Sequence, residues 1–236
     1  MSYSFDSRIR FSEVGEDERL TITNIVNYFQ DSSNFESHDL GIGAEVLAQK
    51  GKAWLLLSWQ IEIKRRPKVA ERVKISTWPY DFKGFYGNRN YTMEGNDGEV
   101  LAFANTIWAY MDVKNQKPTK IDDEELAGYT LQEKLDMEYS PRKVAMPESY
   151  REETPFEVRP TNLDLNHHVN NGQYVAMAEP YLPAGVEISQ IRVEYRTQAT
   201  LGKSIVPLIG ESDDKITVAL CDEEKRPYAL VEFGKV

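Results

Sequence analysis

Apolar and polar residues alternate along several stretches of the chain, and this period of two predicts β-strands. Residues 52–64 are mostly apolar at first and alternate toward their end, and residues 72–78 alternate again. Farther on, the turn Asn96-Asp97-Gly98 separates two more strand-like runs. Asn, Asp and Gly tolerate positive φ, so this turn predicts a hairpin. The first half of the chain is therefore expected to form an antiparallel meander.

The last third of the chain repeats this order of strands and turns. Alternating or apolar runs occupy residues 186–196, 204–212, 215–222 and 228–236. Residues 61–64 also resemble residues 193–196 at an offset of 132 residues. Repetition at this scale predicts one structural unit used twice.

One helix is predicted ahead of each set of strands. Residues 21–37 place their apolar side chains on one face at helical spacing: Ile22, Ile25, Val26 and Phe29. Residues 170–181 place Tyr174, Met177 and Ala178 together, and Pro180 marks the end because proline breaks a helix interior.

A helix followed by an antiparallel meander, twice over, predicts an α+β protein with a tandem, or double, hotdog fold. In such a fold each antiparallel sheet wraps a long helix. We expect an N-terminal hotdog over residues 1–120, an acidic, charged linker over 121–149, and a C-terminal hotdog over 150–236.

Composition narrows the class of protein. Hydrophobic residues make up 41% of the 236 residues, enough for a core, and the net charge of −10 argues against broad binding to nucleic acid. No apolar run reaches the length of a signal peptide or a membrane span, so we expect a cytoplasmic protein without membrane insertion. Cys221 is the only cysteine, which excludes an internal disulfide and any multi-cysteine metal site.

The densest polar cluster, residues 159–172, lies just before the second predicted helix. Asn170 or Asn171 can cap that helix, whose free N–H groups favour an anion or an oxyanion. A histidine beside them suits general-base chemistry near neutral pH. The alternative is structural, because Asp, Asn and Gly also gather in turns and caps for local reasons. A metal site is a weaker interpretation of this cluster, because the side chains of the adjacent His167 and His168 point apart. We expect neither a metal nor a cofactor.

Residues 159–180, RPTNLDLNHHVNNGQYVAMAEP, resemble the signature of acyl-ACP thioesterases, R-x-x-D-x-D-x-N-x-H-V-N-N-x-x-Y followed by an acid. The N-terminal half is also similar to that family, notably over residues 59–78 and 98–112. The resemblance therefore covers nearly the whole chain. Asn162 replaces the first acid of the signature, and the residues that match it are Arg159, Asp164, Asn166, His168, Val169, Asn170, Asn171, Tyr174 and Glu179.

The resemblance implies hydrolysis of fatty acyl-acyl carrier protein, which releases a free fatty acid and ends chain elongation. By that similarity, Asp164, Asn166 and His168 would be the catalytic set. His168 would be base and later acid, Asn166 would orient water or the carbonyl, and Asp164 would be nucleophile or orienting acid. Backbone N–H groups near Val169 and Asn170 would supply the oxyanion site.

Related plant enzymes carry an acid and then a cysteine after the strand that ends here at Arg196. This chain has Gln198 and Ala199 instead. A thiol mechanism is therefore not expected, and Cys221 is interpreted as a small buried hydrophobe. Gln198 can still position a water or a carbonyl, but it cannot take a proton.

The partner that the resemblance implies is an acyl-loaded carrier protein, which is acidic. The basic run Lys64, Arg65, Arg66 and Lys68 is the predicted docking site, although solvated surface charge remains the simpler interpretation of any single residue. The N-terminal hotdog would hold the acyl chain against its helix, with candidate lining residues Trp54, Leu56, Trp59, Trp78, Phe85, Phe103 and Trp108. A homodimer is left open.

Two other functions compete with this one. The first is another hotdog enzyme, either an acyl-CoA thioesterase or an enzyme that acts on thioesters in another way. The second is a non-catalytic module that binds acyl thioesters. The joint presence of Asp164, Asn166 and His168 favours catalysis, and Gln198 is the feature that favours an altered enzyme.

Overall fold

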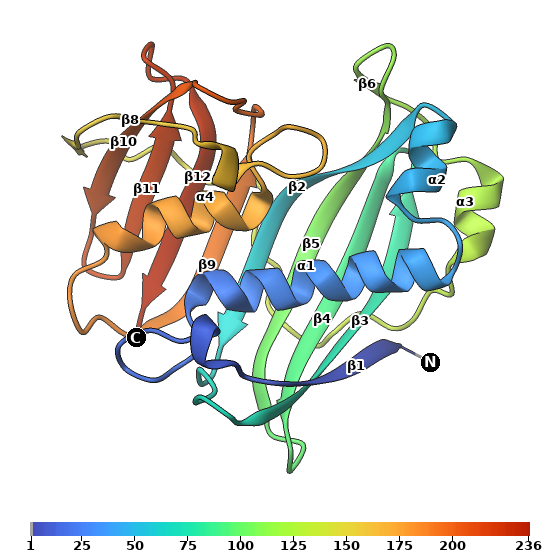
Figure 1. The fold of residues 1–236 in the computed structure, drawn as a ribbon, viewed down its shortest axis with the longest axis horizontal. Coiled ribbons are helices and arrows are strands. Elements are labelled where there is room, and N and C mark those ends of the chain that lie inside the picture. The colour runs from blue at the N-terminus through green and yellow to red at the C-terminus, as the bar shows by residue number, and fades with distance from the viewer. Residues whose placement is uncertain (1) are drawn as a thin grey trace. The chain divides into compact units, whose positions relative to one another are not determined.

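The computed structural model describes residues 2–236 and divides the chain into two compact units (Figure 1). The first unit is formed by the residues up to Leu57 together with Ile63–Tyr139. The second is formed by Ser58–Glu62 together with Ser140–Val236. The division at Tyr139 lies inside the stretch 121–149 that the sequence analysis assigns to a linker. Helix α3 (Asp123–Gly128) also lies in that stretch. No helix of the described chain is long and apolar enough to span a membrane.

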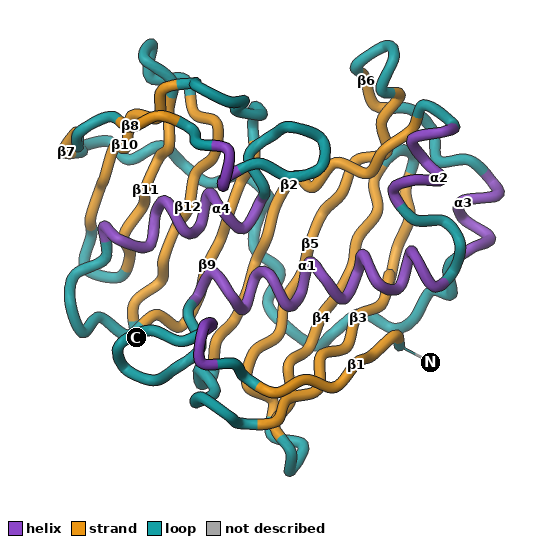
Figure 2. Tube along the Cα trace, viewed as in Figure 1, coloured by secondary structure: helices purple, strands orange, loops and turns teal. Residues whose placement is uncertain are grey.

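The first unit is built on an antiparallel meander with one long helix against it. Its strands are β1 (Tyr3–Arg8), β2 (Lys52–Ile63), β3 (Arg72–Lys83), β4 (Tyr86–Gly95) and β5 (Val100–Asp112), in the spatial order β1-β3-β4-β5-β2. The predicted hairpin between β4 and β5 is confirmed, with Gly98 at φ +81°. Short β6 (Lys117–Pro118) pairs with β5. Helix α1 (Ile22–Asp39) crosses these strands, and α2 (Ala44–Gln49) follows it (Figure 2).

The first predicted helix is confirmed as α1, whose bounds lie close to the expected 21–37. Thr21 caps it by accepting a hydrogen bond from the Asn24 N–H, at 3.2 Å, which satisfies one free donor of the first turn. The predicted apolar face is buried, and the buried residues of α1 are Ile22, Ile25, Val26, Tyr28, Phe29, Ser32, Ser33 and Glu36.

Residues 133–139 cover the other face of this sheet. The Trp78 indole N–H donates to the Glu133 carbonyl at 2.9 Å, and the Asn90 side chain accepts from the Leu135 N–H at 3.0 Å. Side chains alternate along a strand, so Trp78 and Phe103 point away from the α1 side, where Phe29 contacts Tyr91. The expectation that Trp78 and Phe103 line an acyl site beside α1 is wrong for this reason.

The second unit repeats the plan with a shorter helix. Its main strands are β9 (Ile188–Tyr195), β10 (Ser204–Glu211), β11 (Lys215–Cys221) and β12 (Pro227–Lys235), all antiparallel, in the spatial order β9-β12-β11-β10. Residues Ser58–Glu62 of β2 pair with β9, and β7 (Arg151–Glu152) and β8 (Phe156–Glu157) pair with β10. The second predicted helix forms as α4 (Asn171–Ala178), and Pro180 lies in the 3₁₀ turn η3 (Glu179–Tyr181) that follows it.

A strap, residues 140–149, covers the sheet face opposite α4. Tyr195 lies on the α4 side, where its hydroxyl donates to the Asn171 carbonyl at 3.0 Å. Glu194 therefore points to the other face, where its carboxylate accepts from the Val144 N–H at 3.0 Å. Arg192 donates to the carbonyls of Pro141 and Lys143 on the same side. The second unit is thus a sheet between α4 and the strap.

Candidate active site

The predicted catalytic side chains lie on one tight loop that leads into α4. This site loop, residues 159–170, begins with the 3₁₀ turn η2 (Pro160–Asn162) and ends at the cap of α4. Its backbone closes on itself, because the Asp164 N–H donates to the His168 carbonyl at 2.8 Å. His167 takes the left-handed conformation at the tip, with φ +60°. The fold therefore brings Asp164, Asn166 and His168 together within a single turn.

Asp164 braces the loop from inside. Its Oδ1 atom accepts hydrogen bonds from the N–H groups of Asn166, at 2.8 Å, and His168, at 3.2 Å. These bonds place the carboxylate beside the backbone that carries both other residues. Asp164 and His168 are partly buried, whereas Asn166 and His167 are exposed.

The segment after β9 holds the loop from outside. His168 forms a bridge with Thr200, and the Val169 N–H donates to the Ala199 carbonyl at 3.0 Å. The Ala199 N–H in turn donates to the Tyr174 hydroxyl at 2.9 Å. Burial raises the pKa of Tyr174 to about 12, so the hydroxyl keeps its proton at neutral pH. Sequence reasoning assigned no role to Tyr174, although it matches the signature.

The backbone N–H groups of Val169 and Asn170 themselves are not available for the predicted oxyanion site. The Val169 N–H is bonded to Ala199, and the Asn170 N–H donates to the Asn162 carbonyl at 2.9 Å. Both groups are used to hold the loop and are not directed at a substrate. The predicted cap is present, because Asn170 Oδ1 accepts from the Gly172 N–H at 2.9 Å. Gln198 is exposed beside Ala199.

Cys221 lies apart from the site loop. It is fully buried in an apolar cluster on the strap side of the second sheet, with Val144, Leu208 and Leu230 among its members. Burial raises the pKa of the Cys221 thiol to about 11. The thiol therefore stays protonated at neutral pH, which suits a core residue and not a nucleophile.

The basic run predicted to bind a carrier protein is partly committed to internal contacts. Arg65 forms ion pairs with Glu71 at 2.8 Å and Glu99 at 2.7 Å, and Arg66 pairs with Asp17 and donates to the Leu20 carbonyl. Lys64 and Lys68 are exposed, with the Lys64 ammonium 5.5 Å from the centre of the Phe103 ring. Docking by this run stays a prediction, with the exposed Lys64 and Lys68 expected to contribute most to it.

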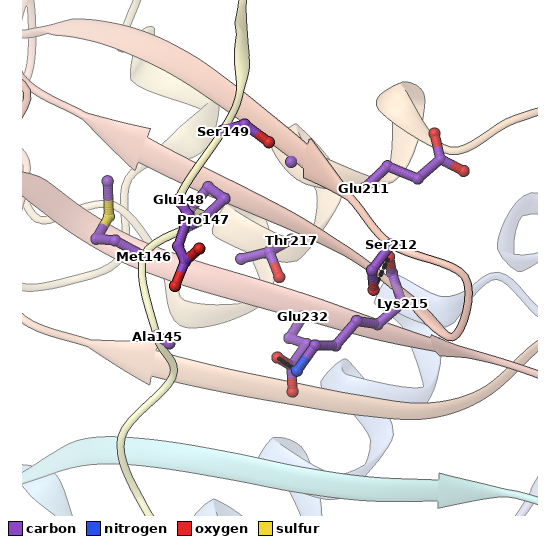
Figure 3. A pocket seen from close by; sticks show the side chains of 11 residues that line it. Ala145, Met146, Pro147, Glu148, Ser149, Glu211, Ser212, Lys215, Thr217 and Glu232 are labelled. Atoms are coloured by element: carbon purple, nitrogen blue, oxygen red, sulfur yellow. Dashed lines mark hydrogen bonds and ion pairs between the residues drawn. The ribbon is translucent and has the colours of Figure 1, made fainter.

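The second unit has a pocket of about 320 Å³, lined by residues of the strap and of strands β10 to β12. Figure 3 shows the side chains that line it. Its buried carboxylate, Glu232, is paired with Arg192 at 2.7 Å and Lys215 at 3.0 Å. No predicted site residue is among those that line it, and Glu232 is already neutralised by two cations. Within residues 2–236, no group of three or more His, Cys, Asp or Glu side chains is placed to hold a metal ion.

A second loop with the same backbone course precedes α1. This matching loop, residues 10–21, corresponds to the site loop at an offset of 149 residues, from Arg10 to Arg159. Each begins with a 3₁₀ turn and ends with a helix cap, and each has one residue at φ near +60°, Glu18 or His167. The Gly15 N–H donates to the Arg19 carbonyl at 2.9 Å, as Asp164 does to His168. Only Arg10 and Arg159 are identical between the two loops, so the correspondence is seen in the backbone and not in the sequence.

The comparisons with known proteins agree with these features. The model of the acyl-ACP thioesterase N-terminal domain matches residues 1–129, and that of the C-terminal domain matches residues 146–226. A chloroplastic acyl-[acyl-carrier-protein] hydrolase of Cuphea viscosissima is 26% identical over 84% of this chain and 52% of its own length. A chloroplastic palmitoyl-acyl carrier protein thioesterase of Gossypium hirsutum is 24% identical over 89% of this chain and 55% of its own length. The chain thus spans about half the length of the curated relatives it matches.

Solved structures share the fold across the whole chain. An acyl-ACP thioesterase from Bacteroides thetaiotaomicron has a TM-score of 0.88 at 20% identity and covers 99% of this chain and 97% of its own. The 12:0-ACP thioesterase from Umbellularia californica has a TM-score of 0.85 at 19% identity, with 100% and 97% covered. These likenesses confirm the predicted α+β hotdog fold. Because the two family models together match most of the sequence, the chain belongs to the acyl-ACP thioesterase family.

Proposed function

We propose that this chain hydrolyses the thioester of a fatty acyl-acyl carrier protein and releases a free fatty acid. One observation carries the proposal: a single tight loop before a helix carries an aspartate, an asparagine and a histidine, and the aspartate carboxylate binds the backbone N–H groups of the other two residues. That set supplies a base, an orienting acid and a polar donor, which are what thioester hydrolysis by water requires.

In the proposed reaction, His168 removes a proton from a water molecule whose oxygen attacks the thioester carbonyl carbon. The tetrahedral intermediate then collapses, the carbon–sulfur bond breaks, and the departing sulfur takes the proton from His168. The products are a fatty acid and the carrier's free thiol. We assign the side-chain amides of Asn166 and Gln198 to the carbonyl oxygen. Both residues are exposed, and they belong to the two segments that the backbone bond from Val169 to Ala199 joins, while the N–H groups of Val169 and Asn170 are occupied.

Asp164 is assigned the role of orienting acid in this scheme. Two backbone N–H groups already bind its Oδ1 atom, and these bonds hold the carboxylate in place. A nucleophilic carboxylate would have to move out of this arrangement to reach a carbonyl carbon. The water mechanism therefore assigns proton transfer to His168 and positioning to Asp164.

The test is release of free fatty acid from matched acyl-carrier and acyl-CoA substrates, with the His168→Ala variant as the control. We expect release from the carrier substrate with the higher kcat/KM and a large loss in the variant. Release from acyl-CoA alone would overturn the assignment of the carrier. Binding of both substrates without release by the native chain would favour a non-catalytic module.

A further inference from the structure

A buried ion pair lies between α1 and the sheet of the first unit, and the proposed mechanism does not use it. The Nη1 atom of Arg89 on β4 donates to the Glu36 carboxylate on α1 and to Thr77 Oγ1, the latter at 3.1 Å. The Arg89 and Glu36 side chains are only 9% and 11% exposed. The Tyr129 ring covers the guanidinium, with 5.4 Å from Cζ to the ring centre.

The sheet surface that faces α1 becomes more polar toward this pair. Three successive rows of paired residues lie on that side: Ile75, Met93 and Ala102; then Thr77, Tyr91 and Ala104; then Arg89 and Thr106. The first row is apolar, the second is mixed, and the third carries the buried charge. On β5 the side chains of the first two rows, Ala102 and Ala104, are small and fully buried.

Helix α1 changes in the same direction. The buried residues of its first half are mainly apolar and include Ile25, Val26 and Phe29, whereas those of its last turns are Ser32, Ser33 and Glu36. Phe29 packs on Tyr91 in the second row, with ring centres 5.4 Å apart, and Glu36 meets Arg89 in the third. Helix and sheet together therefore enclose an apolar layer that ends at a charged pair.

We propose that Glu36 and Arg89 limit the length of the acyl chain that this protein accepts. The inference rests on the proposed function and places the alkyl chain between α1 and the sheet of the first unit. Each methylene buried against apolar side chains strengthens binding by about fourfold. A methylene that reaches the ion pair gains nothing of this kind, because it would separate two charges that stabilise each other.

The pair is expected to act as a unit, and this decides which variants are useful. Loss of one partner leaves a buried charge uncompensated, which is strongly destabilising, whereas replacing both partners with apolar residues is often neutral. Glu36→Leu with Arg89→Met is therefore the informative variant. A matched control removes the exposed pair Lys50 and Glu124, 2.9 Å apart, in the same unit with Lys50→Met and Glu124→Leu.

Two measurements test the proposal. Displacement of a fluorescent fatty acid by saturated fatty acids of increasing length reports binding without any hydrolysis. The kcat/KM values for acyl-carrier substrates of the same lengths report turnover. In the Glu36→Leu/Arg89→Met variant we expect the preferred length to rise by about two carbons and the long-to-short ratio to rise about tenfold. Ala104→Leu, which fills the second row, should shift the preference to shorter chains.

The outcomes separate this inference from the proposed function. If both variants fold, as judged by thermal melting, and their length profiles stay within about twofold of the native and Lys50→Met/Glu124→Leu proteins, the proposal is overturned. If the double variant does not fold, the length profile of Ala104→Leu is the test. A shift to shorter chains supports the proposal, and an unchanged profile overturns it. A shifted binding profile without turnover on any thioester would support the length limit and overturn the hydrolase instead.

Discussion

The matching loop before α1 and the site loop before α4 follow the same backbone course with different side chains. Both turn through a left-handed residue, close with the same backbone hydrogen bond and end at a helix cap. In the matching loop the side chains pair with one another and with the neighbouring strand end. Arg66 binds Asp17 and the Leu20 carbonyl, and Arg19 donates to the Arg66 carbonyl at 3.3 Å.

Loop geometry alone therefore does not make a catalytic site. Where the site loop has His168, the matching loop has Arg19, whose guanidinium stays charged and cannot act as a base. Where the site loop has Asp164, the matching loop has Gly15, and Asp17 takes part of the bracing by accepting from the Arg19 N–H at 3.1 Å. The same backbone thus serves as a structural support in one unit and presents the candidate chemistry in the other.

The largest expected effect follows from His168, which has no basic counterpart in the matching loop. His168→Ala should lower kcat by about 10²- to 10⁴-fold, because the general base is removed. His167→Ala should stay within several-fold, although the backbone strain at the tip changes. Free-acid release under saturating substrate measures both variants. Equal losses at the two positions would show that the base is misassigned.

Two substitutions of Asp164 distinguish its hydrogen bonds to the loop backbone from the effect of its negative charge. Asp164→Asn keeps an oxygen that accepts from Asn166 and His168 but removes the negative charge, so it should lower kcat on the order of 10²-fold with little change in melting temperature. Asp164→Gly, which copies Gly15, should also destabilise the fold by about 1 kcal/mol for the lost hydrogen bonds. Full activity in the Asn variant would overturn the orienting role of the carboxylate.

The two helix caps give a matched pair of substitutions. Thr21→Ala and Asn170→Ala should each cost about 1 kcal/mol of stability, because each removes a side-chain acceptor from the first turn of its helix. Only Asn170→Ala should also lower hydrolysis, by about tenfold, since its cap anchors the candidate site. Denaturant unfolding and kcat/KM measured on both proteins check the contrast. A similar loss of activity in Thr21→Ala would argue for a general effect of stability.

Arg66 tests whether the basic run supports the matching loop or a partner. Arg66→Met should lower stability by up to about 1 kcal/mol, as its partly exposed ion pair with Asp17 is lost, with KM for the carrier substrate almost unchanged. Lys68→Met should do the reverse and raise that KM while melting stays the same. A KM that rises only in Arg66→Met would assign docking to the arginine.

The smallest expected effect is at Cys221. Cys221→Ser should keep kcat within about twofold, with a modest loss of stability from a hydroxyl buried among apolar side chains. Thiol-blocking reagents should leave the folded native protein active, because the buried thiol stays protonated. Loss of turnover from a still-folded Cys221→Ser protein would contradict the water mechanism.

Much of the fold follows from local patterns in the sequence. The face of α1, the Asn96-Asp97-Gly98 hairpin and the strands β9 to β12 depend on residue periodicity and on turn chemistry. The cap at Asn170 follows from a side chain that bonds the backbone two residues ahead. Such features can be predicted because the interacting groups are near neighbours in the chain.

Other features were decided only when distant segments met. The sequence determined which donors the site loop carries, but contact with Ala199 decided that the Val169 N–H is occupied. Likewise, periodicity marked Trp78 and Phe103 as strand residues, and only the contact of Phe29 with Tyr91 showed which side of the sheet faces α1. The pairing of Arg89 with Glu36 joins residues 53 positions apart. A strand or helix defines its own faces, but the partner that covers each face is fixed by packing between elements far apart in the sequence.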